Sequence, residues 1–240
     1  MPSRKPQGSE NAASSSLERA QDEARRVGLS LSPDAQGLAL TDGQMTVHGD
    51  FSHLSARLKP ANLSRELLVR AARIKGAHHP LTAVDATAGL GEDALLLAAA
   101  GFEVQLFERN PVIAALLQDA LSRAAFQPEL ADAVARMHLT ESDSIGYLTA
   151  LDEAPDIVLL DPMFPEKRKS AAVKKKLQLL QRLESPCDDE TALLDAALAT
   201  KPRKVIVKRP VKGPFLAGRD PSYSLAGKAV RYDCYTLARE

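Results

Sequence analysis

Cysteine is scarce in this sequence, in which only Cys187 and Cys234 occur. They do not form a C-x-x-C pair, which argues against a disulfide scaffold and a zinc site and fits a reducing cytosol. No apolar run approaches the roughly twenty residues needed to span a bilayer, and none of signal-peptide length opens the chain. We therefore expect a soluble, cytoplasmic protein with no metal and no membrane partner.

A net charge is also lacking, because 31 basic side chains are balanced by 31 acidic ones. The charge of the whole molecule therefore neither requires nor excludes a polyanionic partner, and only local basic clusters can indicate nucleic acid. A chain of 240 residues can bury the core of one α/β domain with a small appendage. Nothing in the sequence indicates the oligomeric state.

The first part of the chain divides into two segments of different composition. Residues 1–16 are rich in Ser, Pro, Gly, Asn and charge, which predicts a disordered tail. Residues 17–60 contain short apolar runs separated by turn formers, and Asp42-Gly43 is a strong hairpin signal. This pattern predicts a small β-rich appendage, which we expect on the substrate side of the protein.

Residues 61–240 have the pattern of a larger α/β domain. After a helical stretch from Leu63 to Lys75, short apolar strands alternate with longer helical segments, which predicts βαβ units and a mostly parallel, Rossmann-like sheet. The expected strands are Thr82–Asp85, Val104–Glu108, Met137–Thr140, Asp156–Asp161, Lys204–Lys208 and a late antiparallel strand, Arg231–Leu237. The expected helices between them are Asp93–Ala100, Pro111–Ala125, Val173–Leu183 and Glu190–Leu198.

A glycine-containing turn joins the first of these strands to its helix. Gly89 and Gly91 allow a tight turn and a close approach of a ligand, and the following helix offers free N–H groups. The next strand ends in Glu108, at about the spacing of a carboxylate that binds ribose hydroxyls. Asp143 and Ser144 follow the third strand, where an adenine-edge contact is expected. The alternative is that the glycines only make a turn and that the acidic residues are solvated caps.

Three acidic residues indicate which nucleotide-type ligand this turn accepts. Asp85 ends the first strand, four residues before Gly89, where it suits the methionine amino group of S-adenosylmethionine and repels a pyrophosphate. Glu92 and Asp93 open the following helix and also favour a cationic or zwitterionic ligand. These residues therefore favour S-adenosylmethionine over a nicotinamide dinucleotide.

The most informative stretch, Asp161-Pro-Met-Phe-Pro, follows an apolar strand. It is similar to the Asn/Asp-Pro-Pro-Tyr/Phe motif of base amino-methyltransferases, with Met163 in place of the second proline. The Asp161 carboxylate and the Pro162 carbonyl suit the two N–H groups of an exocyclic amine, and Phe164 suits stacking on an unpaired or flipped base. The alternative is a proline-stiffened loop in which Phe164 only covers the core.

Basic residues around this loop indicate a polyanionic substrate. Lys208 and Arg209 leave the fifth strand at the carboxyl edge of the sheet, where they are candidate phosphate contacts. The alternative for these basic residues is a charged strand end or a solvated helix face. A second group of candidate RNA contacts follows the loop and comprises Lys167, Arg168, Lys169, Lys174, Lys175 and Lys176.

The chain resembles the RsmJ family of bacterial 16S ribosomal RNA guanine-N2 methyltransferases over roughly residues 81–237. Four segments carry the resemblance: Asp85-Ala-Thr-Ala-Gly-Leu-Gly, Glu108-Arg-Asn-Pro, Leu160-Asp-Pro-Met-Phe-Pro and Val207-Lys-Arg-Pro. The resemblance implies a class I methyltransferase fold, S-adenosylmethionine as cofactor, and a guanosine near the 3′ end of small-subunit ribosomal RNA as substrate. It also places a set of residues at cofactor-contacting positions: Glu92, Asp93, Glu108, Arg109, Asp143, Ser144 and Asp161. The chain departs from the family at Glu92, where an arginine is usual.

Two other functions remain open at this point. The same acceptor geometry serves an amine in another RNA, in DNA or in a protein amide. A non-catalytic RNA-binding module that kept the fold is the alternative from another class, although Asp161 and both glycines argue against it.

Overall fold

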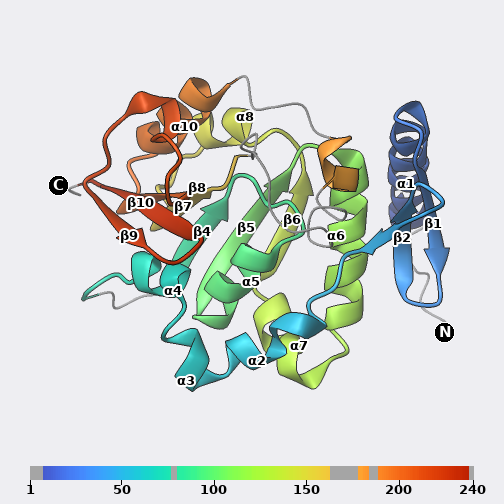
Figure 1. The fold of residues 1–240 in the computed structure, drawn as a ribbon, viewed down its shortest axis with the longest axis horizontal. Coiled ribbons are helices and arrows are strands. Elements are labelled where there is room, and N and C mark those ends of the chain that lie inside the picture. The colour runs from blue at the N-terminus through green and yellow to red at the C-terminus, as the bar shows by residue number, and fades with distance from the viewer. Residues whose placement is uncertain (1–7, 77–79, 163–177, 184–188, 238–240) are drawn as a thin grey trace.

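The computed structural model describes residues 8–76, 80–162, 178–183 and 189–237 (Figure 1). At its centre is a seven-stranded sheet with the strand order β6-β5-β4-β7-β8-β10-β9. All neighbouring strands from β6 to β8 run parallel, whereas β10 is antiparallel to both β8 and β9. The strands are β4 (Leu81–Asp85), β5 (Phe102–Glu108), β6 (Met137–Glu141), β7 (Ile157–Leu160), β8 (Lys204–Pro210), β9 (Tyr223–Ala226) and β10 (Val230–Thr236).

Helices cover both faces of this sheet, as expected of parallel strands whose side chains are buried on both sides. All four residues of β7, which has neighbours on both sides, are buried. One face is covered by α4 (Leu67–Ala72), α5 (Glu92–Ala99), α6 (Pro111–Ala124) and α7 (Pro128–Val134), and the other by α8 (Ser144–Thr149) and α10 (Glu190–Ala199). Further short helical segments are η1 (Ser52–Leu54), α2 (Ser55–Leu58), α3 (Pro60–Leu63) and η2 (Leu216–Gly218), and residues 178–181 are also helical. The mostly parallel α/β fold with a late antiparallel strand is therefore confirmed.

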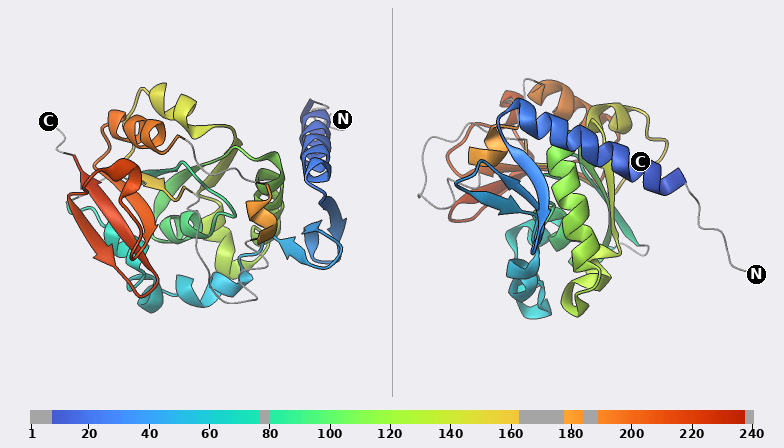
Figure 2. Two further views of the ribbon diagram at one scale, coloured as in Figure 1. Left: turned by 45° about the horizontal axis from the view of Figure 1, so that its top comes forward. Right: turned by 90° about the vertical axis from the view of Figure 1, so that its right-hand side faces the viewer.

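The N-terminal β appendage is a three-stranded antiparallel sheet. It consists of β1 (Ser30–Asp34), β2 (Gly37–Thr41) and β3 (Thr46–His48). Asp42 Oδ1 accepts hydrogen bonds from the backbone N–H groups of Gln44 and Met45, both at 2.9 Å, and so forms the tight turn between β2 and β3. Figure 2 shows this sheet beside α6, on the side of the molecule opposite β9 and β10.

The predicted disordered tail is wrong from residue 8 onward, because helix α1 (Gly8–Arg26) begins there. Ala20 and Ala24 of this helix are fully buried in a cluster with Leu40 of β2 and Leu116 of α6. Short helices gain most of their stability from such tertiary packing. Because the partners lie far away in the sequence, the composition of residues 1–16 did not indicate the helix.

The remaining differences from the predicted elements are local. The helix expected from Leu63 to Lys75 is divided into α3 and α4. Short elements α7, α8 and β9 were not predicted. Most of the helix expected at 173–183 lies outside the described residues. In the part of the chain that the structure describes, every helix is too short or too polar to cross a membrane.

Candidate active site

A cavity of about 340 Å³ lies at the carboxyl ends of the parallel strands. The chain runs from β4 outward through β5 and β6 and then crosses back to β7 on the other side of β4. The strand order therefore reverses at β4, which is where ligands bind in such sheets. The cavity brings together most of the residues that the sequence singled out. These are Asp85, Gly89, Glu92, Asp93, Glu108, Arg109, Asp143, Ser144, Asp161, Pro162 and Lys208.

The two glycines of the turn have different roles. Gly89 and Gly91 have φ angles of 54° and 75°, in the left-handed region that favours glycine. A Cβ on Gly89 meets nothing within 4 Å, because this residue faces the open cavity. A Cβ on Gly91 lies 2.7 Å from Leu117 Cδ1. Gly91 therefore caps the start of α5 and allows α5 to pack closely against α6; its expected contact with the cofactor stays a prediction.

Glu108 ties the end of β5 to the glycine turn. Its Oε2 accepts a hydrogen bond from Gly89 N at 3.0 Å, and its Oε1 accepts one from Asn110 N at 2.8 Å. Burial raises the pKa of this carboxyl, and the two backbone N–H groups oppose the rise. Each carboxylate oxygen has a further lone pair, so the fixed carboxylate can accept hydrogen bonds from two neighbouring hydroxyl groups.

Asp161 lies across the cavity and is held at two points. Its backbone N–H donates to Thr87 Oγ1 at 2.6 Å, and its Oδ2 pairs with Lys208 Nζ at 2.9 Å. Its carboxyl stays partly exposed to the cavity. Removal from bulk water raises the pKa of Asp161, whereas the Lys208 ammonium lowers it. The site therefore presents an oriented carboxylate at the end of β7.

Asp85 is the most deeply buried acid of the cavity. Its Oδ1 accepts a hydrogen bond from Thr87 N at 3.1 Å. Burial raises the pKa of Asp85 to about 8, and the nearby carboxylates of Asp93 and Asp161 add to the rise. A cationic ligand beside Asp85 therefore stabilises the ionised form of this carboxyl.

The other wall combines a helix N-terminus with apolar side chains. Asp143 Oδ1 caps α8 by accepting from Ile145 N at 2.9 Å, and Ser144 is buried beside it. Phe107 and Ile145 line the cavity there, and the Phe107 ring lies 4.2 Å from that of Tyr147. An apolar wall beside a hydrogen-bonding edge suits a flat, aromatic base.

Sequence reasoning missed several residues of the site. Thr87 and Asn110 were quoted only as parts of motifs, although Thr87 positions Asp161 and Asn110 caps α6 by accepting from Val112 N at 2.9 Å. The Asn-Pro pair at 110–111 is a helix-start signal that would have identified the cap. The apolar lining of Phe107 and Ile145 has no sequence signal of its own.

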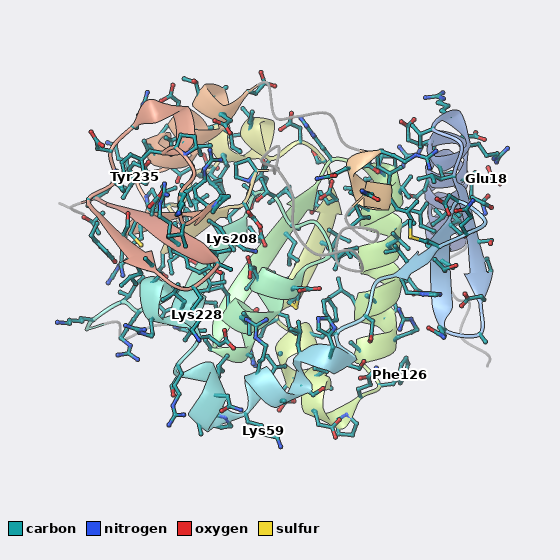
Figure 3. The ribbon with its side chains drawn as sticks, viewed as in Figure 1. Glu18, Lys59, Phe126, Lys208, Lys228 and Tyr235 are labelled. Atoms are coloured by element: carbon teal, nitrogen blue, oxygen red, sulfur yellow. The ribbon has the colours of Figure 1, made fainter. Side chains whose placement is uncertain are left out.

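The predicted phosphate contacts on β8 are wrong in this structure. Lys208 points into the cavity, where its Nζ lies 2.6 Å from Asp93 Oδ2 as well as 2.9 Å from Asp161 (Figure 3). Arg209 faces the other side of the sheet, is 1 % exposed and pairs with Glu190 at 3.2 Å. Successive residues of a strand point to opposite faces, so the pair does not form one basic surface.

Of the other predicted contact residues, the structure describes some and not others. Glu92 lines the cavity, with its Oε1 3.4 Å from His53 Nε2. Phe164 and the six basic residues between positions 167 and 176 lie outside the described residues. In the described ranges, no group of three or more His, Cys, Asp or Glu side chains is arranged to hold a metal ion; the expectation of no metal stays a prediction.

Comparisons with known proteins identify the family. The model of the family described as putative SAM-dependent methyltransferases matches residues 13–237. The ribosomal RNA small subunit methyltransferase J of Thioalkalivibrio sulfidiphilus is 47 % identical over 213 residues, covering 87 % of this chain and 81 % of that protein. The protein of the same name from Pseudomonas aeruginosa strain UCBPP-PA14 is 45 % identical over 208 residues, covering 86 % and 77 %. The chain belongs to the methyltransferase J family.

A solved structure agrees with this membership. The crystal structure of a SAM-dependent methyltransferase from Neisseria gonorrhoeae has a TM-score of 0.69 to this chain at 32 % sequence identity. It covers 92 % of both chains. The sequence-based expectations of a class I methyltransferase fold and of S-adenosylmethionine as cofactor are thus confirmed.

The residues of this methyltransferase J site fit S-adenosylmethionine. The cofactor carries positive charge on its sulfonium and amino groups, and the cavity supplies the carboxyl groups of Asp85, Asp93 and Asp161. Its ribose has two neighbouring hydroxyls, which match the two fixed oxygens of Glu108. Gly89 leaves open space where a side chain would project into the cavity. We therefore assign the methionine end to Asp85, the ribose to Glu108 and the adenine to the wall of Phe107 and Ile145, as proposals for these side chains.

Proposed function

We propose that this enzyme methylates the exocyclic N2 amine of a guanosine in small-subunit ribosomal RNA, in the cytoplasm. The observation that carries the proposal is the position of Asp161. Its carboxylate is held by Lys208 and its backbone by Thr87, at the mouth of the cavity beside Pro162. The names of the curated relatives point to small-subunit ribosomal RNA as the substrate.

The chemistry of an exocyclic amine explains why such an acceptor is needed. The lone pair of this amine is delocalised into the ring, so it is a weak nucleophile. Bound S-adenosylmethionine supplies an electrophilic methyl group. Lys208 engages Oδ2 of Asp161, so we assign Oδ1 of Asp161 and the carbonyl of Pro162 to the two N–H groups. Holding both N–H groups orients the amine for in-line attack, which accounts for much of the rate enhancement in a reaction between two bound groups.

The same carboxylate has a second task. When the new N–C bond forms, one proton has to leave the nitrogen, and Asp161 already accepts a hydrogen bond from that N–H. The raised pKa of Asp161 makes it a better proton acceptor than an ordinary surface aspartate. Lys208 and Thr87 hold the Asp161 carboxylate in place, so this group does not have to reorient during methyl transfer.

Residues outside the described ranges complete the proposal for the RNA side. Phe164 follows Asp161-Pro162-Met163 in the sequence, and we propose that it stacks on the target base. We propose as phosphate contacts the basic residues that follow it in the sequence, which are Lys167, Arg168, Lys169, Lys174, Lys175 and Lys176.

Methylation in vitro tests this function and its alternatives. Small ribosomal subunits and ribosomal RNA from cells lacking the enzyme, DNA and a protein fraction are each incubated with the enzyme and S-adenosylmethionine. Mass spectrometry of the digested nucleosides then identifies the product. We expect N2-methylguanosine to increase in the ribosomal substrates only. Methylation only of DNA or protein, or of a different nucleoside, contradicts the proposal.

Replacing Asp161 tests the mechanism. We expect Asp161→Ala to lower kcat by about two to three orders of magnitude, the range for removing a group that stabilises the transition state. RNA affinity should change little. Cofactor affinity is measured by calorimetry in the same variant, because Asp161 lines the cofactor cavity. Asp132→Ala, at an exposed position of α7, is the matched control. Near-normal turnover of Asp161→Ala at saturating cofactor and RNA refutes the proposed role.

A further inference from the structure

One segment of this neutral protein is rich in basic side chains. Residues 57–75 carry six basic side chains and a single acidic one, Glu66. Helix α4 in this segment packs against β8, β9 and β10, so this part of the segment, with Arg70, lies at the β9 edge of the sheet (Figure 1). The basic residues are Arg57, Lys59, Arg65, Arg70, Arg73 and Lys75, all exposed except the half-buried Arg57.

The charges of this neutral chain are unevenly distributed along the sequence. Residues 127–156, which include the edge strand β6, carry seven acidic side chains and one basic one, Arg136. Of these acids, Asp143 lines the cavity, and Asp156 is buried and pairs with Arg203. A local cluster of exposed cations attracts a polyanion even when the net charge is zero.

The basic segment continues into the wall of the cavity. Arg57 donates to both carboxylate oxygens of Glu66 at 2.7 Å, and its guanidinium interacts electrostatically with Asp93, which lines the cavity. Arg65 precedes Glu66 and is exposed. The basic surface therefore begins beside the part of the site that contains Lys208 and Asp161.

The turn between β9 and β10 adds a cation to this surface. A Cβ placed on Gly227 in this turn lies 3.2 Å from Leu67 Cδ2 of α4, so the turn rests on the start of that helix. Lys228 follows Gly227 in this turn and is exposed (Figure 3), and Arg65 lies two residues before Leu67 in the sequence. Among the described contacts, none pairs Arg65, Arg70 or Lys228 with a carboxylate.

We propose that Arg65, Arg70 and Lys228 form a docking surface for the RNA backbone, and that the RNA enters the cavity from the β9 side of the sheet. The proposal rests on the proposed function and adds the direction of approach. Exposed cations bind phosphates by releasing condensed counterions, so each contact contributes to the salt dependence of binding. Such contacts position a nucleic acid without reading its sequence.

The triple substitution Arg65→Gln, Arg70→Gln and Lys228→Gln tests this surface in the full-length protein. Binding to fluorescently labelled small-subunit ribosomal RNA is measured by anisotropy between 50 and 200 mM KCl, roughly the range in which salt effects on such complexes are large. We expect an affinity loss of about tenfold at the lowest salt, and a slope of log K against log salt that is shallower by about two units, at roughly 0.7 per contact. Cofactor affinity and melting temperature should not change.

A second triple variant separates a local surface from whole-molecule charge. Arg19→Gln, Arg25→Gln and Arg26→Gln remove the same charge from exposed positions of α1, on the opposite side of the sheet. We expect this variant to retain most of the RNA affinity and the slope of the unmodified protein. Equal losses in the two triple variants, or an unchanged slope in the first, overturn the docking surface. An unmodified protein that neither binds nor methylates ribosomal RNA contradicts the proposed function instead.

Discussion

At the scale of single residues, Lys208 has the most direct effect on the protonation of the Asp161 carboxyl. It lies 2.6 Å from Asp93 and 2.9 Å from Asp161, and its ammonium lowers the pKa of Asp161 against the effect of burial. The other titratable groups that interact with Asp161 are Asp85, whose pKa is itself raised by burial, the buried Tyr232 of β10, and Arg209, whose positive charge also lowers the pKa of Asp161. Only Lys208 combines a positive charge with direct contact to Asp161 among these cavity residues.

Removing that charge should change the pH dependence of methylation. In Lys208→Met, the pKa of Asp161 rises further, so its ionised form is lost at a higher pH as the solution is acidified. We expect the acidic limb of the kcat profile to move to higher pH by about one unit or more, with lower kcat at neutral pH. Lys208→Arg keeps the charge and should shift the limb less. An unmoved limb in Lys208→Met shows that Lys208 only supports the structure.

Asp85 should give a different signature, which is a proton released when the cofactor binds. The pKa of Asp85 is raised to about 8, so at pH 7 the carboxyl is mostly protonated in the ligand-free protein. A cation bound beside it lowers this pKa, and affinity should therefore increase as the pH rises from 7 towards 8.

Calorimetry in phosphate and in Tris measures the proton release, because these buffers differ in their heat of ionisation. We expect the binding enthalpies of the unmodified protein to differ between the buffers by an amount that corresponds to nearly one proton. Asp85→Asn should remove the difference. Equal heats for the unmodified protein in both buffers contradict a protonated Asp85 facing the cofactor.

At the scale of elements, the N-terminal helix and sheet depend on α6 for their core. Leu40 of β2 is fully buried with Ala20, Ala24 and Leu116. We expect Leu40→Ala to lower the free energy of unfolding by about 2–5 kcal/mol, the range for a buried leucine, as measured by urea denaturation. Thr46→Ala on exposed β3 is the control. Every described residue that lines the cavity lies at or after position 85, so cofactor affinity should be retained; a large loss would show that the two parts are coupled.

The elements also differ in how far sequence could predict them. The strands β4 to β8 lie within two residues of their expected bounds. Most of them are short apolar runs between polar turns that neighbouring strands bury, whereas the edge strand β6 is largely exposed. Helices α1 and α8 were not predicted. Helix α1 is stabilised through contacts with α6, which lies far away in the sequence. Helix α8 has only six residues, and its N-cap residue, Asp143, is equally typical of an ordinary turn.

At the scale of the whole molecule, the balanced composition conceals an uneven charge distribution. The sequence order places the basic segment 57–75 before β4 and the acidic segment 127–156 around β6. Helix α4 of the basic segment and strand β6 of the acidic segment lie at opposite edges only because β5 and β6 extend the sheet on one side of β4, and the later strands extend it on the other. Net charge alone therefore gives no information about the direction from which RNA approaches.

The sequence by itself determined the α/β class, the glycine turn, Glu108 and the Asp161-Pro162 motif, because these depend on local periodicity and on motifs contiguous in the chain. Tertiary structure alone decided what the charged side chains of β8 contact. Lys208 and Arg209 are adjacent in the sequence, but the alternation of a strand sends one into the cavity and the other to the opposite face. The partners of Lys208 come from α5 and from the end of β7, more than 40 residues away, so only the folded sheet brings them together.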